Sequence, residues 1–267
     1  MTATFQLTTP FAEGRTSDIY AWENDQILKL YRDWCPPEWI ENELKVAQTI
    51  HAAGIPTPAA GGIVAANGRR GIVYERISGI SMLQDMNNRP WTIFRHAREL
   101  AKMQTQYQRL DVPGLYSYHA SFGNAIRRVP ILPEPTRQKL LSRLEKLPDE
   151  KTLCHGDFHP GNVILSPHGP VVIDWMTACS GSPWADAART FVILSVGPRA
   201  AGRQLNTITR LFIRLFTRTY LNHYKQLTPQ EGMGLNDWLP VVAAARLEEK
   251  IEPEREGLLD IVEKGLE

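Results

Sequence analysis

A polar loop between two apolar stretches is the feature that most limits what this chain can fold into. The loop reads His155-Gly156-Asp157-Phe158-His159-Pro160-Gly161-Asn162, with apolar residues at 153–154 before it and 163–165 after it. A further apolar stretch, 171–173, follows the turn-like residues 166–170 and ends at Asp174. Short apolar runs separated by turn residues predict β-strands joined by a hairpin. We therefore expect Asp157, Asn162 and Asp174 on two loops of one compact β segment.

Those three side chains suit phosphoryl transfer. One carboxylate can orient or deprotonate an attacking hydroxyl, while an amide oxygen and a second carboxylate hold Mg²⁺ on the phosphates. Taken singly, Asp157 and Asn162 also fit plain turn formers, and Asp174 fits a strand-end cap. The combination at this spacing favours the chemical role, because His-x-Asp-x-x-x-x-Asn followed by an Asp after an apolar strand matches the catalytic and metal loops of protein kinases.

The segment from His155 to Trp175 resembles the aminoglycoside phosphotransferase and choline kinase family of small-molecule kinases. Gly156 and Trp175 stand where protein kinases usually carry Arg and Phe-Gly, which points to the small-molecule branch. The resemblance runs over residues 11–190 and is specific in the catalytic segment. It implies an α+β, bilobal, protein-kinase-like fold, with a small β-rich nucleotide-binding lobe at 1–78 and a larger, mainly helical catalytic and substrate-binding lobe at 79–267.

The local sequence patterns also indicate a first part rich in strands and a second part rich in helices. Two hairpins are predicted. Residues 23–26 are the turn between strand-like runs at 18–22 and 27–31, and Asn67-Gly68 is the turn between runs at 61–65 and 71–76. Helical periodicity over 37–53 ends at Gly54. Residues 77–90 are expected to be a linker, and a proline-marked loop is expected between 110 and 136. Helices are predicted over 91–110, 136–147, 187–195, 203–224, 237–247 and 257–266.

Lys29 and Glu43 are predicted to form an ion pair in which Lys29 binds nucleotide phosphates and Glu43 positions Lys29. Lys29 lies inside an apolar strand-like run, where a solvated edge position is the simpler explanation. Glu43, however, shares one helix face with apolar residues at 40, 44, 47 and 50. A carboxylate on a buried face needs a partner, and kinases use such a lysine and glutamate.

Other nucleotide contacts are expected from the small lobe. The stretch Glu13-Gly14-Arg15-Thr16-Ser17-Asp18 has one glycine, so Thr16 and Ser17 are candidate phosphate contacts in a reduced loop, or simply a turn before a strand. The resemblance implies that Glu75 and Ile77 hold the purine through backbone groups, with Tyr74 behind them. It implies ATP as phosphate donor and leaves GTP open.

Two further positions follow from the resemblance. Asp186, in Gly181-Ser182-Pro183-Trp184-Ala185-Asp186, is expected to brace the catalytic loop without reacting. Gln104 stands where the family often has His, and the sequence does not say what that changes.

The acceptor is not identified by the sequence. An acidic cluster, Glu248, Glu249, Glu252, Glu254 and Glu256, suits a polycationic acceptor, but Lys250 and Arg255 interleave with it and favour a solvated face. Trp91, Tyr116, Tyr118 and Trp238 could line a pocket for a quaternary ammonium or belong to the core.

Charge and cysteine content exclude several classes of protein. The 267 residues carry 30 Lys plus Arg against 29 Asp plus Glu, a net charge of +1, which predicts no general affinity for nucleic acid or anionic membrane. Three cysteines without metal-type spacing disfavour a disulfide scaffold and a zinc ribbon. Residues 1–10 lack a basic stretch and an apolar core of a signal peptide, so a cytoplasmic protein is expected. The oligomeric state is unreadable.

The sequence thus predicts an Mg²⁺-dependent kinase that transfers the γ-phosphate of ATP or GTP to a hydroxyl of a small acceptor. Asp157 is the expected catalytic base or hydroxyl-orienting group, and Asn162 and Asp174 are the expected metal ligands. A non-catalytic nucleotide-binding regulatory module is the main alternative. A protein kinase is less favoured, because the chain reaches Asp186 soon after Asp174 and has no Ala-Pro-Glu motif.

Overall fold

The computed structural model describes residues 9–200, 206–228 and 232–267. By their contacts these residues group into two units, and each is described by itself. Among the described residues, the first unit joins 9–82 to Gly161–Ala178, and the second joins Leu83–Pro160 to those from Cys179 onward. The hairpin at 163–172 thus belongs to the first unit, although the expected second lobe began at residue 79. The division into a nucleotide-binding lobe at 1–78 and a catalytic lobe at 79–267 stays a prediction.

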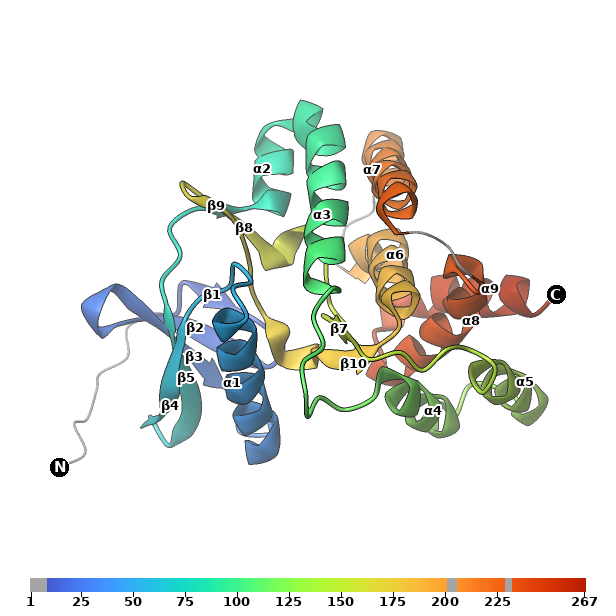
Figure 1. The fold of residues 1–267 in the computed structure, drawn as a ribbon, viewed down its shortest axis with the longest axis horizontal. Helices are drawn as coiled ribbons and strands as arrows, with labels where there is room; N and C mark the ends of the chain where they lie inside the picture. Colours follow the sequence, from blue (N-terminus) through green and yellow to red (C-terminus); the bar gives the residue numbers. More distant parts are fainter. Residues whose placement is uncertain (1–8, 201–205, 229–231) are drawn as a thin grey trace. The chain divides into compact units, whose positions relative to one another are not determined.

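The larger sheet of the first unit has five antiparallel strands, in the order β1-β2-β3-β5-β4 (Figure 1). Its strands are β1 Ala12–Glu13, β2 Ser17–Trp22, β3 Gln26–Tyr31, β4 Ala60–Ala66 and β5 Arg69–Glu75. Both predicted hairpins are confirmed. Asn67 and Gly68 have φ angles of 50° and 76°, which matches the left-handed turn that the twist of paired strands favours.

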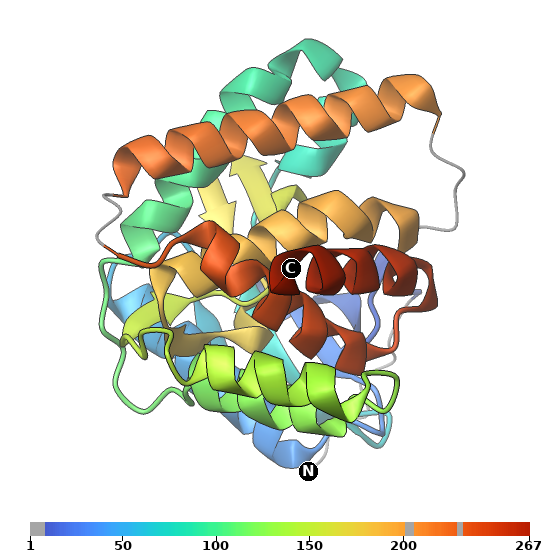
Figure 2. The same cartoon turned by 90° about the vertical axis from the view of Figure 1, so that its right-hand side faces the viewer.

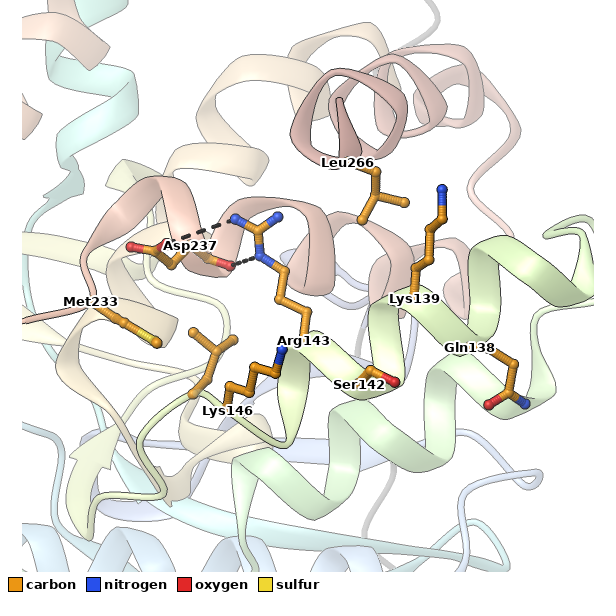
Figure 3. A pocket seen from close by; sticks show the side chains of 9 residues that line it. Gln138, Lys139, Ser142, Arg143, Lys146, Met233, Asp237 and Leu266 are labelled. Atoms are coloured by element: carbon orange, nitrogen blue, oxygen red, sulfur yellow. Dashed lines mark hydrogen bonds and ion pairs between the residues drawn. The ribbon is translucent and has the colours of Figure 1, made fainter.

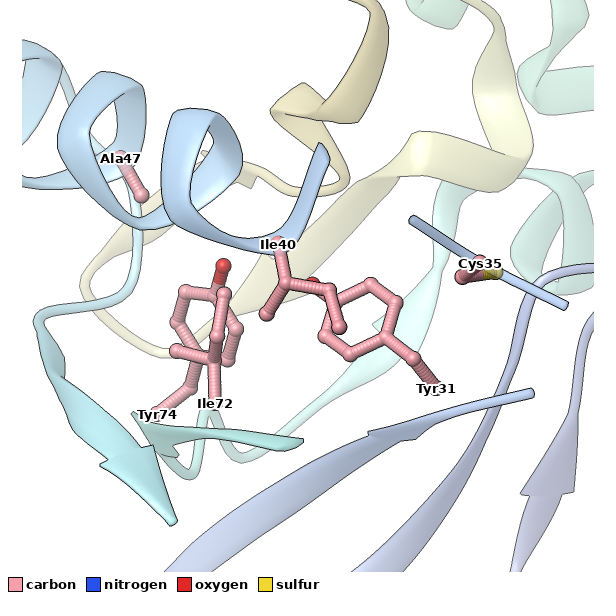
Figure 4. Packing of buried hydrophobic residues seen from close by; sticks show 6 residues of the cluster. All are labelled: Tyr31, Cys35, Ile40, Ala47, Ile72 and Tyr74. Carbon is pink, nitrogen blue, oxygen red and sulfur yellow. The ribbon is translucent and has the colours of Figure 1, made fainter. Parts of the chain in front are cut away.

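Helix α1, Pro37–Ala52, packs against this sheet. Ile40 and Ala47 of the helix meet Tyr31, Ile72 and Tyr74 of the strands in a buried cluster (Figure 4). The helix ends just before Gly54, as predicted, and Gly54 has a φ of 80°. This packing fixes the buried face of α1, which carries Glu43, against strand β3, which carries Lys29.

A three-stranded sheet completes the first unit and corrects one expectation. β6 Ile80–Ser81 pairs with β8 Val163–Ser166, which pairs with β9 Gly169–Val172. Within residues 77–90, which were expected to be a linker, Ile80–Ser81 form a strand and Met82–Asn88 form helix α2. Backbone pairing to a strand more than 80 residues away cannot be seen in local composition.

The second unit is mainly helical (Figure 2). Its helices are α3 Ile93–Tyr107, α4 Tyr118–Arg128, α5 Glu134–Leu144, α6 Pro183–Ala200, α7 Thr207–Leu227, α8 Leu235–Arg246 and α9 Arg255–Leu266. A small sheet pairs β7 Thr152–Cys154 with β10 Cys179–Gly181. The prediction for 203–224 starts at Arg203, which lies outside the described residues. Within the described parts of the chain, no helix has the length and apolar character needed to cross a membrane.

Helix α4 lies where a proline-marked loop was predicted, so that prediction was wrong. Ser117 caps the helix by accepting a hydrogen bond from the Ala120 N–H at 3.1 Å. Phe122, Ala125 and Ile126 form its buried face. The prolines flank this helix and do not interrupt it.

Candidate active site

Lys29 is the centre of the polar cluster in the first unit. Its ammonium lies 2.6 Å from Glu43 Oε1 and 2.7 Å from Asp174 Oδ1, and the residue is only 7% exposed. The predicted contact between Lys29 and Glu43 is therefore present. Asp174 joins it because the β8–β9 hairpin belongs to this unit.

Two tyrosines hold the other side of Glu43. The Tyr31 hydroxyl donates to Glu43 Oε2 at 2.5 Å, and the Tyr74 hydroxyl donates to Glu43 Oε1 at 3.1 Å. Tyr31 was missed by the sequence reasoning, although it lies two residues after Lys29 and so shares its face of the strand. The buried carboxylate is thus fully satisfied and fixed in place.

The charge on Lys29 is maintained by its neighbours. Burial alone lowers the pKa of Lys29, but the carboxylates of Asp174 and Glu43 outweigh it, so the pKa stands above its ordinary value. A permanently charged, fixed ammonium is what binding of anionic phosphates requires.

Asp174 and Asn162 present oxygen atoms suited to Mg²⁺. The Ile173 N–H donates to the Asn162 carbonyl at 3.0 Å, which ties the two loops together. Asp174 adopts a left-handed backbone with a φ of 65°, and its side chain is 42% exposed. No group of three or more His, Cys, Asp or Glu residues able to hold a metal occurs among the described residues. Mg²⁺ needs fewer protein ligands, since it keeps water and phosphate oxygens, so one amide and one carboxylate fit it.

The other predicted nucleotide contacts also lie in the first unit. Ser17 is buried at the start of β2, and the Thr16 carbonyl accepts a hydrogen bond from the Arg32 N–H at 2.8 Å. Glu75 ends β5, its N–H donating to the Ala59 carbonyl at 2.9 Å, and half-buried Ile77 follows. These placements leave the roles of Thr16, Ser17, Tyr74, Glu75 and Ile77 as predictions.

Asp157 lies in the second unit, after β7. Its N–H donates to His155 Nδ1 at 3.2 Å, and its carboxylate lies 3.7 Å from His159 Nε2. Burial alone raises the pKa of Asp157, but His159 and Arg189 outweigh it and hold the pKa well below its usual range. The side chain is therefore an ionised acceptor, as a hydroxyl-orienting group must be.

Asp186 braces the loop before Asp157, as predicted. Gly156 has a φ of 78°, a backbone that favours glycine, and its N–H donates to Asp186 Oδ1 at 2.9 Å. Asp186 is fully buried, and Tyr107, Gln104 and Gln108 donate to its Oδ2 at 2.7, 2.9 and 3.1 Å. The requirement for a positive φ explains why Gly156 stands at this place.

Gln104 acts as a donor to Asp186. Its carbonyl oxygen accepts a hydrogen bond from Tyr220 of α7, and its amide nitrogen points at Asp186. Gln104, which stands where a His was expected, therefore supplies a donor to this carboxylate.

The acidic cluster near the C-terminus is largely paired with arginines. Glu248 bonds Arg128, Glu249 bonds Arg189 and Arg246, and Glu252 lies 3.5 Å from Arg255. Glu254 is 1% exposed and accepts from Arg246 at 2.5 and 2.8 Å. A solvated face does not describe Glu254, and none of these four carboxylates is without a cationic partner.

A separate cavity of about 550 Å³ lies between α5 and the C-terminal helices (Figure 3). Its walls include Lys139, Arg143 and Lys146, but none of the predicted site residues. Arg143 donates to the carbonyls of Asp237 and Gly265 at 3.0 and 2.5 Å. This arginine therefore ties the C-terminal helices together.

The family of this chain follows from a comparison with known protein families. A family model described as the phosphotransferase enzyme family matches residues 8–221. The chain belongs to this family. The predicted family and enzyme class are thus confirmed. The protein is a small-molecule phosphotransferase that transfers phosphate to a hydroxyl group. A search of curated protein sequences gives no match.

Solved structures show the fold of this phosphotransferase. A thermostable mutant of aminoglycoside phosphotransferase APH(4)-Ia, in ternary complex with AMP-PNP and hygromycin B, is 14% identical with a TM-score of 0.64, covering 97% of this chain and 90% of that one. Amicoumacin kinase hAmiN, in complex with AMP-PNP, Ca²⁺ and Ami, is 14% identical with a TM-score of 0.64, covering 97% and 87%. A choline/ethanolamine kinase family protein from Mesorhizobium loti is 13% identical with a TM-score of 0.59, covering 98% and 86%. The expected α+β, protein-kinase-like fold is confirmed.

Proposed function

We propose that this phosphotransferase moves the γ-phosphate of ATP or GTP, bound with Mg²⁺, to a hydroxyl of a small molecule. The observation that carries the proposal is the buried Lys29 ammonium, held by Glu43 on one side and by Asp174 on the other. Structural neighbours in complex with AMP-PNP support a nucleotide as donor.

The first unit supplies the groups that hold the donor. Lys29 binds phosphate oxygens, and Glu43 keeps Lys29 in place with the help of Tyr31 and Tyr74. Asn162 and Asp174 would hold Mg²⁺, which neutralises phosphate charge when bound. Thr16 and Ser17 add phosphate contacts, and Glu75 and Ile77 hold the purine through their backbone.

Asp157 of the second unit acts on the acceptor. The acceptor oxygen forms a bond to the γ-phosphorus as the bond from that phosphorus to the β,γ-bridging oxygen breaks, and the nucleoside diphosphate leaves. The hydroxyl proton passes to Asp157. Its depressed pKa suits it better to orienting the hydroxyl early and taking the proton late in the step.

We further propose an acceptor with at most one positive charge. A polycation would need unpaired carboxylates, but Glu248, Glu249 and Glu254 already bond arginines. Withdrawing one partner from a buried ion pair leaves an uncompensated charge, so Glu249 and Glu254, whose arginines are buried, are poorly placed to bind a cationic ligand.

The test is transfer of label from [γ-³²P]ATP and, in parallel, [γ-³²P]GTP, with and without Mg²⁺. The acceptors are sugars, amino alcohols, choline-like amines, macrolides and aminoglycosides, and Asp157→Asn is the control enzyme. Transfer to a neutral or singly charged acceptor, lost without Mg²⁺ and in the control, is the expected result. Efficient transfer to a polycationic aminoglycoside would overturn the proposed limit on the charge of the acceptor, but not the proposed kinase activity.

The competing functions give different results in the same assay. Tight Mg²⁺–nucleotide binding without transfer to any acceptor would favour the regulatory module. Label appearing on a protein substrate would favour a protein kinase.

A further inference from the structure

Gly156, the residue before Asp157, is held at its N–H and at its carbonyl by the first two turns of α6. Asp186 accepts the Gly156 N–H at 2.9 Å, and the Nε–H of Arg189 donates to the Gly156 carbonyl at 3.0 Å. The two residues are three positions apart, so they lie on neighbouring points of one helix face. The carbonyl that Arg189 holds belongs to the peptide bond that leads directly into Asp157.

Arg189 is itself held by the C-terminal segment. The residue is 8% exposed, and its guanidinium forms an ion pair with Glu249. Glu249 also lies 3.3 Å from Arg246, which bonds buried Glu254. Glu249 and Glu254 lie beyond residues 8–221, the part of the chain that matches the family. A segment outside that match is therefore connected to the loop of Asp157.

Arg189 is influenced by two carboxylates at once. Burial lowers its pKa, but Glu249 and, more weakly, Tyr118 and Asp157 outweigh this and hold it above its ordinary value. The charged or titratable groups that act on Asp157 are His159, Arg189 and His155, and Glu249 is the carboxylate that shares Arg189 with it. If Glu249 loses its charge, Asp157 becomes the stronger partner for the guanidinium.

We propose that Arg189 is a positioning residue for Asp157, and that Glu249 is the counterion that keeps the Arg189 guanidinium away from the Asp157 carboxylate. This inference rests on the proposed role of Asp157. A guanidinium paired with Asp157 would occupy the oxygen that must accept the hydroxyl of the acceptor. The C-terminal segment thus keeps the acceptor-orienting carboxylate available.

The experiment compares Arg189→Met, Arg189→Lys, Glu249→Gln and the double variant Arg189→Met/Glu249→Gln, with Glu248→Gln as matched control. Glu248 is the neighbouring glutamate, but it bonds Arg128 and makes no contact with Arg189 that the structure records. For each variant, kcat, the acceptor KM and the nucleotide Kd are measured, with thermal unfolding as a check of folding.

Arg189→Met is expected to lower kcat by about a hundredfold, because small displacements of a reacting group have costs of that order. Arg189→Lys recovers part of the loss, since it can still donate to the Gly156 carbonyl. Glu249→Gln lowers kcat by about tenfold but has no further effect in the Arg189→Met background, as expected for residues that act through one contact. Nucleotide Kd stays unchanged throughout, because Lys29 and Asp174 are untouched, and Glu248→Gln behaves as wild type.

A crystal structure of Glu249→Gln provides a readout that needs no turnover. The proposal predicts the Arg189 guanidinium on the Asp157 carboxylate, and a guanidinium that makes no bond to that carboxylate in the variant would overturn it. Wild-type kcat in Glu249→Gln, or additive losses in the double variant, would overturn it too. Full activity of Asp157→Asn would instead overturn the proposed function, which keeps the two failures distinguishable.

Discussion

The ammonium of Lys29 lies 2.7 Å from the carboxylate of Asp174, although 145 positions separate the two residues in the chain. The lysine that should bind phosphate is therefore bonded to a side chain that should bind the metal. A nucleotide with its Mg²⁺ offers new partners to both groups, since phosphate attracts Lys29 and the cation attracts Asp174. Donor binding would then replace this ion pair with a contact between Lys29 and phosphate and a contact between Asp174 and the cation.

Replacing Glu43 tests the support of Lys29. Glu43→Gln removes the charge that holds the ammonium, so we expect weaker nucleotide binding and a kcat lower by at least about tenfold. Glu41→Gln is the matched control, because Glu41 lies on the same helix but is exposed and pairs with Arg70 at the surface. Kinetics and isothermal titration calorimetry with both variants measure the difference. Equal behaviour of the two variants would contradict the assigned role of Glu43.

Replacing Asp174 tests the metal site. Asp174→Ala removes a carboxylate that would ligate Mg²⁺, so nucleotide affinity should lose its dependence on Mg²⁺. Titration of a fluorescent ATP analogue with and without Mg²⁺ measures this directly. An affinity that still rises with Mg²⁺ as in the wild type would remove Asp174 from the metal site.

The Asp157 side chain is expected to carry the transfer step. Asp157→Ala should lower kcat by about 10²- to 10⁴-fold, the usual contribution of a positioned acid or base. Nucleotide affinity should be kept, because the donor is held by other residues. Single-turnover assays and titration calorimetry separate the two quantities. Full turnover in Asp157→Ala would show that another group orients the hydroxyl.

The pH dependence follows from the charges around Asp157. Because its pKa is held below the usual range, Asp157 is ionised in the folded protein throughout ordinary assay conditions. Ionised Asp157 adds stability above its unfolded pKa of about 3.9, and this is lost as pH falls through the lower folded pKa. Arg189→Met removes a cation but leaves the burial, so the pKa of Asp157 rises. The loss of stability at acid pH should then begin at a higher pH in Arg189→Met than in the wild type, and an unshifted pH profile of unfolding would contradict the influence of Arg189 on Asp157.

Gly156 is expected to tolerate no side chain. Its φ of 78° lies in the left-handed region, so Gly156→Ala should cost about 1 to 2 kcal/mol of folding free energy and displace the Asp157 loop. Gly62→Ala is the control, since Gly62 lies in a strand with nothing within 4 Å of an added Cβ. Denaturant unfolding and kcat are measured for both. A Gly156→Ala enzyme with wild-type stability and kcat would contradict this requirement.

Short-range patterns accounted for most of the first unit. The hairpin turns and the buried stripe of α1 depend on neighbouring residues, so period-two and period-3.6 patterns were enough to predict them. Lys29 and Glu43 were paired by the same reasoning, because a buried carboxylate needs a partner and a strand lysine stood nearby in sequence. Helix α4 was missed because the prolines on either side of it indicated a loop, and its apolar face is too short to indicate a helix clearly.

The sequence by itself determined the chemical groups of the site, since the types and spacing of Asp157, Asn162 and Asp174 depend on one local segment. It also determined the family. Only the tertiary structure decided which distant groups act on them. Asp174 meets Lys29, and Arg189 connects Gly156 to Glu249, through helices and strands packed from separate parts of the chain. Such contacts depend on the packing of whole elements, and no local periodicity records them.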